Sequence, residues 1–163
     1  MTTESIDELL LQGLQEMYYT EQQLVDALET MAEQSQNEDA KSAFSEHQAE
    51  TEGQVDRLER VFDQLGEEPT EMEDAVVQSM LTEHEQFAGE NEGEILERYN
   101  MELGQKTEHY EIASYGSLIS LAEKTGHDEA AEMLVQTMEE EQAALETVTE
   151  ISERYDEQQL AGN

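Results

Sequence analysis

Apolar residues recur every three or four positions along most of this chain, which is the spacing of one face of an α-helix. One such stripe runs through Leu10, Leu14, Met17, Glu21, Leu24, Leu28 and Met31, with steps that alternate between four and three. This alternation is typical of a helix that packs within a bundle of helices. The fourth member, Glu21, is a carboxylate at a position where the pattern calls for an apolar side chain.

Interruptions of this pattern divide the chain into five predicted helices. They fall at residues 35–37, 66–70, 89–93 and 125–126, where residues that end or begin helices occur. The predicted helices are four long ones and one short one: residues 3–34, 38–65, 72–88, 93–125 and 127–155. With one proline and strong helix formers throughout, we predict an all-α protein. The 163 residues are expected to form a single domain with a short polar tail at about 156–163.

Acidic residues also occupy core positions in the other long helices. The stripe of the segment 93–125 is Met101, Gly104, Glu108, Glu111, Tyr115, Leu118 and Ala122, so two adjacent positions in it are glutamates. In the segment 38–65, Glu50 lies one helical turn after His47, beside the apolar stripe. In the segment 127–155 two stripes compete, one through Glu140 and one through Glu141, and the pattern does not decide between them.

The spacing of these acids predicts that they meet. Glu50 follows Glu21 by 29 positions. Glu140 follows Glu111 by the same number, so each pair is centred on a predicted turn. In an antiparallel helical hairpin such residues lie at the same height, here about 22 Å from the turn. Two hairpins therefore bring four glutamates into one layer.

The chemistry of this layer favours metal ions. Glu108 and His47 each precede a layer glutamate by three residues and share its helix face, so they join the layer. Burying one unpaired carboxylate costs several kcal/mol, whereas a whole domain is stable by only about 5–15 kcal/mol. No basic residue is expected to neutralise the layer, because the lysines and arginines, among them Arg57, are out of phase with the stripes. Several carboxylates with one imidazole suit a pair of iron or manganese ions.

Two further side chains have expected places. Tyr115 lies one turn from Glu111, where it would donate a hydrogen bond behind the metal ligands, relay a radical, or fill the core with a polar end. His84, on the short helix, is expected at the surface.

The charge of the chain limits its partners. Its 42 acidic residues against seven basic ones give a formal net charge of −35. Nucleic acid and anionic membrane surfaces repel such a protein, so neither is an expected partner. Periodic apolar residues argue against disorder, and we interpret the acidity as a solvated surface suited to high salt. The chain has no cysteine, no segment apolar enough for a membrane span and no signal-peptide pattern, so a cytoplasmic protein is expected.

Four segments resemble the YciE/YciF family of ferritin-like proteins. They are YYTEQQL, EHQAETEGQVDRLE, EHYEIASYGSLISLAE and EEEQ, and the likeness extends from about Ile6 to Ile151. The resemblance implies a ferritin-like four-helix bundle with a short fifth helix in the crossover between helices two and three, a dimer, and a di-metal site similar to that of rubrerythrin. The family is associated with stress responses. Ferritin-like sites usually carry Glu-x-x-His on two helices, whereas this chain has His47-x-x-Glu50 on one and Thr137 where a second histidine is expected.

We therefore expect a di-metal carboxylate protein that uses two iron or manganese ions on dioxygen or peroxide in stress protection. It would be an oxidoreductase of the peroxidase, catalase or ferroxidase type. The expected metal ligands are Glu21, His47, Glu50, Glu108, Glu111 and Glu140. Among them Glu111 would bridge the two ions together with either Glu50 or Glu140.

Two other functions stay open at this point. One is a metal-binding or storage protein without turnover, and the other is a structural or interaction protein whose ancestral site holds no metal. For assembly, the flank of residues 93–125 offers more apolar surface, with Ile112 and Ile119, than one bundle face needs. A homodimer is therefore expected.

Overall fold

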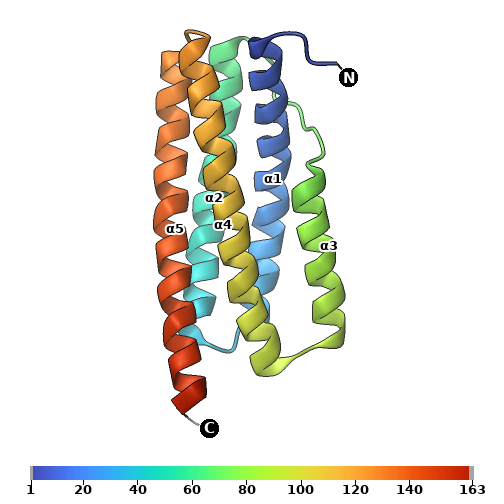
Figure 1. Cartoon of the computed structure of the whole chain (residues 1–163), viewed down its shortest axis with the longest axis vertical. Helices are drawn as coiled ribbons and strands as arrows, with labels where there is room; N and C mark the ends of the chain where they lie inside the picture. Colours follow the sequence, from blue (N-terminus) through green and yellow to red (C-terminus); the bar gives the residue numbers. More distant parts are fainter. Residues whose placement is uncertain (1, 162–163) are drawn as a thin grey trace.

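The computed structural model describes residues 2–161, which form helices and the connections between them (Figure 1). The helices are α1 (Ile6–Gln34), α2 (Glu38–Leu65), α3 (Ala75–Glu90), α4 (Gly93–Lys124) and α5 (Asp128–Ala161). No strand occurs among the described residues, so the all-α prediction is confirmed. None of these helices, within the part of the chain described, is long and apolar enough to cross a membrane.

Local capping explains where the first two helices begin and end. Ser5 and Asn37 accept hydrogen bonds from the backbone N–H groups of Glu8 and Ala40, and these bonds begin α1 and α2. Gly66 ends α2 in the left-handed conformation, with φ 72°, which glycine adopts without strain. The first two predicted helices therefore match the structure closely.

The start of α3 differs from the prediction. It begins at Ala75 rather than at residue 72, because the Asp74 carboxylate caps it by accepting hydrogen bonds from the N–H groups of Val76 and Val77. The same carboxylate also accepts a hydrogen bond from the hydroxyl of Tyr110 on α4. Asp74 thereby fixes the first turn of α3 against the long helices.

The last helix is longer than expected. α5 continues to Ala161 instead of ending at residue 155, so the expected polar tail is helical as far as the described residues extend. Contacts with α4 stabilise this extension: Tyr155 is buried, and Arg98 Nε donates a hydrogen bond to Asp156 Oδ1 at 2.7 Å. Residues 162–163 of the expected tail lie outside the described part.

The four long helices pack side by side as two hairpins. α1 packs against α2, and α4 packs against α5, across the short turns that join them. The hairpins meet where α1 contacts α4 and where α2 contacts α5. The chain crosses from the first hairpin to the second through residues 66–74 and α3, which lies outside the four long helices and packs on α4 (Figure 1). This arrangement brings one face of each long helix to a common interior.

That interior contains two separate apolar clusters. One includes Leu14, Phe62, Tyr115 and Leu134, toward the end where α1 begins. The other includes Leu28, Met31, Phe44, Met101 and Ile151, toward the turn between α1 and α2. Between them lie the acidic positions of the four helices. Ile119 belongs to the first cluster and is buried within this chain, which removes it from the apolar surface expected for a dimer.

A series of buried polar contacts connects α3, α4 and α1. His84 lies 2.7 Å, measured from Nε2, from Asn100 Oδ1, and Asn100 Nδ2 donates to Gln34 Oε1 at 3.0 Å. The His84 ring also stacks on Tyr99. The expectation that His84 lies at the surface is therefore wrong, since both its ring face and its nitrogen have partners on α4.

Candidate metal centre

Five ionisable side chains converge between the two apolar clusters. α1 contributes Glu21, α2 contributes His47, α4 contributes Glu108 and Glu111, and α5 contributes Glu141. The four glutamates are at most 3% exposed, and His47 is 9% exposed. They meet because each occupies the inward position of its helix at the same height in the hairpins. We call these five residues the acid cluster.

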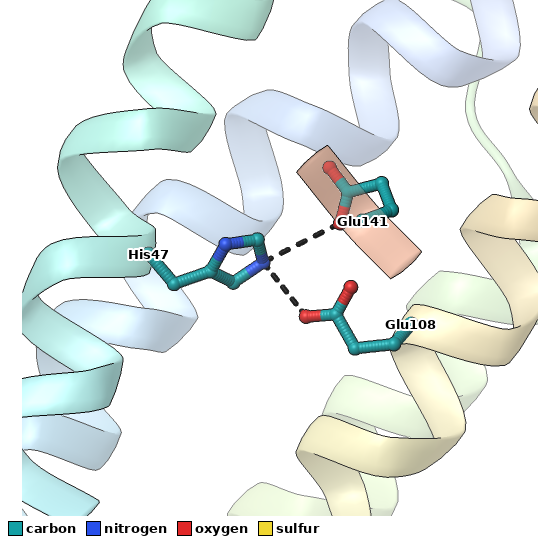
Figure 2. Close-up of side chains that lie close together, drawn as sticks. All are labelled: His47, Glu108 and Glu141. Carbon is teal, nitrogen blue, oxygen red and sulfur yellow. Dashed lines mark ion pairs between the residues drawn. The ribbon is translucent and has the colours of Figure 1, made fainter. Parts of the chain in front are cut away.

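His47 contacts two of the cluster glutamates through one ring nitrogen (Figure 2). Its Nε2 lies 2.7 Å from Glu108 Oε1 and 3.5 Å from Glu141 Oε2. The other ring nitrogen, Nδ1, lies 3.3 Å from Glu50 Oε2. Glu50 thus holds the outer side of the imidazole, and in the neutral ring its carboxylate favours the tautomer with the proton on Nδ1, which leaves the Nε2 lone pair facing the cluster.

The acid cluster contains two groups of ligand atoms that share one glutamate. His47, Glu108 and Glu141 form the first group, and Glu21, Glu111 and Glu141 form the second. Within each group, one ligand atom from each residue lies within 4.8 Å of the other two. Two cations placed in these groups would therefore have Glu141 in common.

Most of the cluster oxygens accept no hydrogen bond from any described residue. This holds for both carboxylate oxygens of Glu111 and of Glu141, and for the Oε2 atoms of Glu21 and Glu108. The partnered oxygen of Glu21 accepts a hydrogen bond from the Tyr115 hydroxyl. Buried polar atoms in folded proteins usually have partners, so this set of unpartnered oxygens indicates that cations or protons complete the site.

Burial controls the protonation of the acidic members. It raises the pKa of Glu21 to about 7, although the hydrogen bond from Tyr115 acts in the opposite direction. Burial likewise raises the pKa of Glu111 well above its ordinary value, and the nearby charge of Glu21 adds to the effect. The pKa of Glu141 is raised for the same reasons, first by burial and then by the charge of Glu111. Without a cation, the centre therefore retains protons that free carboxyl groups would lose.

The pKa of the His47 imidazole is also raised, but by its hydrogen-bond partners and against the effect of burial. Burial by itself lowers the pKa of His47, but the hydrogen bonds to Glu108 and Glu50 outweigh it and raise the pKa to about 10. A cation at the first group would take the place of the proton on Nε2. The donor set, mainly carboxylate oxygen with one imidazole nitrogen, fits divalent ions of the first transition series such as iron and manganese.

Glu140, one of the expected ligands, lies outside the acid cluster. Arg57 donates to both of its oxygens, from Nη1 to Oε2 and from Nη2 to Oε1, each at 2.8 Å. Gln54 Nε2 adds a third hydrogen bond at 3.1 Å. Although burial acts to raise the pKa of Glu140, the hydrogen bond from Arg57 outweighs it and the pKa is lowered. The neighbouring Glu141 takes the inward position instead.

The sequence signal for this difference was available but weak. Arg57 is only 8% exposed, so the expectation that it lies out of phase with the core is wrong. It follows Gln54, a stripe residue, by three positions, which is also a same-face spacing in a helix. Its Nη1 reaches Thr137 Oγ1 at 2.7 Å, so Thr137, considered as a substitute for histidine, contacts this ion pair.

Glu50 occupies the border of the centre. Its side chain is 41% exposed and belongs to neither group of ligand atoms. Its contact with His47 places it behind a candidate ligand. Glu21, His47, Glu108 and Glu111 are brought together as the spacing predicts, whereas Glu50 and Glu140 belong to neither group and Glu141 is common to both.

A pocket connects the centre with the surface between α2, α4 and α5. It measures about 240 Å³ and is lined on its buried side by His47, Glu108 and Phe44. Its outer lining includes the exposed residues Glu46 and Glu50. A small molecule or ion can therefore approach the first ligand group without unfolding a helix.

Comparison with known proteins identifies the family. A family model described as "Domain of unknown function (DUF892)" matches residues 5–161. The chain belongs to this family. Protein YciF of Escherichia coli (strain K12) is 33% identical over 154 residues, which are 93% of this chain and 93% of that protein. The resemblance to the YciE/YciF family that the sequence segments predict is confirmed.

Solved structures of DUF892 relatives share the fold. The crystal structure of the E. coli stress protein YciF matches with a TM-score of 0.88 and 31% identity, over 94% of this chain and 98% of YciF. YcfI of Rhodopseudomonas palustris, for which a structural role is suggested, matches with a TM-score of 0.87 and 36% identity, over 90% and 94% of the two chains. The arrangement of helices that positions the acid cluster is thus shared with these two proteins.

The ion pair between Arg57 and Glu140 is predicted to contribute to the free energy of unfolding. Arg57→Leu leaves Glu140 half-buried and without its cation, so we expect the free energy of unfolding to fall by about 2 kcal/mol. The double variant Arg57→Leu/Glu140→Leu removes the uncompensated charge and should regain at least half of that loss. Urea denaturation followed by circular dichroism measures both. Arg98→Leu, which breaks an exposed pair, is the control and should cost less than about 1 kcal/mol. A double variant no more stable than the single one would contradict this account.

The raised pKa values predict that the metal-free protein loses stability as pH rises. Glu21 has a folded pKa of about 7, above its ordinary 4.5, and His47 one of about 10, above its ordinary 6.5. Between the ordinary and the folded pKa of each group, the folded chain therefore holds more protons than the unfolded chain. Its free energy of unfolding falls as the pH rises through these two ranges. The loss for Glu21 alone is on the order of 3 kcal/mol between pH 4.5 and 7.

Glu111→Gln isolates the buried contribution in this experiment. Glutamine cannot ionise, so the variant should lose stability less steeply than the unmodified chain as pH rises above 4.5, the ordinary pKa of the carboxyl group. Urea denaturation in the presence of a chelator, at a series of pH values, measures the two slopes. Solvated surface acids contribute equally to both proteins, so identical slopes would show that Glu111 keeps an ordinary pKa.

Proposed function

We propose that this chain is a ferritin-like member of the stress-protein family, a four-helix bundle with α3 in the crossover, that binds two iron or manganese ions in its core. The observation that supports this most strongly is the set of buried carboxylate oxygens without hydrogen-bond partners, which three helices bring together around one imidazole. Cations offset the cost of burying these acids, and no lysine or arginine belongs to the described cluster.

Each proposed ligand has a distinct role. One ion would be held by His47, Glu108 and Glu141, and the other by Glu21, Glu111 and Glu141. When bound, iron or manganese would supply Lewis acidity and access to a second oxidation state. Outside the ligands, Glu50 orients the His47 ring, and the Tyr115 hydroxyl holds one oxygen of Glu21.

The apolar clusters shield the centre from water on the two sides where they lie, along the axis of the bundle. Their side chains also hold the helices at the spacing that the ligands require. The chain would therefore contribute a rigid site that is open to solvent through the α2–α4–α5 pocket, whether or not the ions react. Metal binding without turnover is the function that the geometry supports best, and a homodimer remains a prediction beside it.

A matched pair of neighbouring variants tests the metal centre. Because Glu141 belongs to both ligand groups, Glu141→Gln should lower the content from two ions per chain to fewer than one. Glu140→Gln should keep two ions, since Arg57 holds Glu140 outside the cluster. Equilibrium dialysis against Mn²⁺, or against Fe²⁺ without oxygen, followed by elemental analysis gives the stoichiometry.

Thermal or urea denaturation supplies a second readout. At a free ion concentration about 100 times the Kd, each bound ion should stabilise the unmodified chain by about 2.7 kcal/mol, and Glu141→Gln should abolish most of this gain. Two ions retained by Glu141→Gln, or lost by Glu140→Gln, would refute the ligand assignment.

A second candidate function is oxidoreduction of a small oxidant, peroxide or dioxygen, in stress protection. The specific observation in its favour is the α2–α4–α5 pocket, which gives a small molecule a path to His47 and Glu108. A sealed core would store ions equally well but would admit no substrate.

Peroxide consumption separates turnover from binding alone. If the centre is catalytic, the metal-loaded chain should consume hydrogen peroxide at least about tenfold faster than the same concentration of free ions. Glu141→Gln should reduce the rate to that of free ions. An oxygen electrode or the absorbance of peroxide follows the reaction. A loaded chain that reacts no faster than free metal would leave metal binding without turnover as the function.

A further inference from the structure

The centre lies where ions cannot reach it through the helices themselves. Glu21 and Glu141 are fully buried, and Glu111 is 1% exposed. Among the pockets along the described helices, two have the same volume of about 240 Å³, so their linings can be compared directly. The α2–α4–α5 pocket includes two members of the acid cluster, His47 and Glu108. The other, between α1 and α4, includes none.

Small residues leave the α2–α4–α5 pocket open. Gly104, Ala143 and Ala144 contribute to its walls. A Cβ atom at Gly104 would lie 3.4 Å from Val148 Cγ2 and 3.5 Å from Phe44 Cε1, so anything larger than a methyl group would occupy the opening. The path to His47 thus depends on short side chains at these positions.

The charges along the pocket favour a cation as its occupant. Glu46 and Glu50 are exposed at the outer side, and no lysine or arginine lines it within the described chain. At the inner side Glu108 is 3% exposed, and its Oε2 atom has no hydrogen-bond partner. In a chain with a net charge of −35, the surrounding field also concentrates cations over anions.

We propose that the α2–α4–α5 pocket is the entrance through which divalent cations load the centre. Glu46 and Glu50 capture a hydrated ion at the surface, and His47 with Glu108 accepts it at the inner side, from where ions reach the remaining ligands. This inference rests on the proposed function, because it supplies the route to the metal sites named there. The walls of the pocket limit the size of the ion that can enter, and the carboxylates favour ions of positive charge.

Loading kinetics with Co²⁺ alone test the entrance. The metal-free full chain is mixed with Co²⁺, and the visible d–d absorption of the bound ion gives the rate, while dialysis gives the final stoichiometry. Ala144→Leu narrows the pocket with a strong helix former, so it should load at least about tenfold more slowly and still bind two ions at equilibrium. Ser117→Leu places the same side chain in the other pocket and should load at the unmodified rate.

A second variant tests the charge separately from the width. Glu46 is exposed, and Glu46→Gln removes its negative charge, so the variant should load more slowly at low ionic strength. Because Glu46 belongs to neither ligand group, the variant should still bind two ions. The difference from the unmodified chain should shrink as salt screens the carboxylate. This variant decides the matter if Ala144→Leu folds poorly, as judged by circular dichroism.

The outcomes distinguish the entrance from the centre. Slow loading with full stoichiometry in Ala144→Leu, and salt-dependent slowing in Glu46→Gln, support the entrance. Unchanged rates in both variants overturn it and leave the metal centre intact. An unmodified chain that binds no Co²⁺ at equilibrium would overturn the proposed function, and the entrance with it.

Discussion

The burial of four carboxylates in one layer between two apolar clusters is the constraint on which the rest of the structure depends. Each buried charge without a partner costs several kcal/mol, and a domain of this size is stable by about 5–15 kcal/mol in total. The layer therefore cannot hold four free negative charges. Protons satisfy it in part, as the raised pKa values of Glu21, Glu111 and Glu141 indicate, and divalent cations would satisfy it fully. The flanking clusters supply the burial free energy that keeps the helices together around this layer.

Much of this arrangement follows from the sequence, because the direction and the height of a side chain on a helix can be calculated from its position in the chain. A glutamate on an apolar stripe points inward, and two glutamates equally far from a turn lie level. These two rules place Glu21, Glu108, Glu111 and His47 together before any coordinates are known. They also predict the four long helices, because the stripes stop where capping residues and glycines occur.

The same rules fail on α5, where two stripes overlap. Adjacent helix positions differ by about 100° in direction, so a run of glutamates such as 139–141 always leaves more than one candidate near the core face. The choice between them is made by tertiary structure. Arg57 on α2 binds Glu140 through two hydrogen bonds and holds it outside the acid cluster, while Glu141 takes the buried position. The pattern within α5 offers both glutamates, and the partner of Glu140 lies more than 80 positions away in the sequence.

Buried acids in this chain differ in whether the fold supplies hydrogen-bond donors to them. Asp74 is also buried, yet Oδ1 accepts from two backbone N–H groups of α3, and Oδ2 accepts from the hydroxyls of Thr20 and Tyr110. Both oxygens of Asp74 therefore have hydrogen-bond partners within the protein, where the residue acts as a helix cap. Glu111 and Glu141 are at least as deeply buried and receive no hydrogen bond from the described residues. Donors could have evolved beside them as readily as beside Asp74. The fold therefore leaves the oxygens of this layer to be satisfied by protons or by cations.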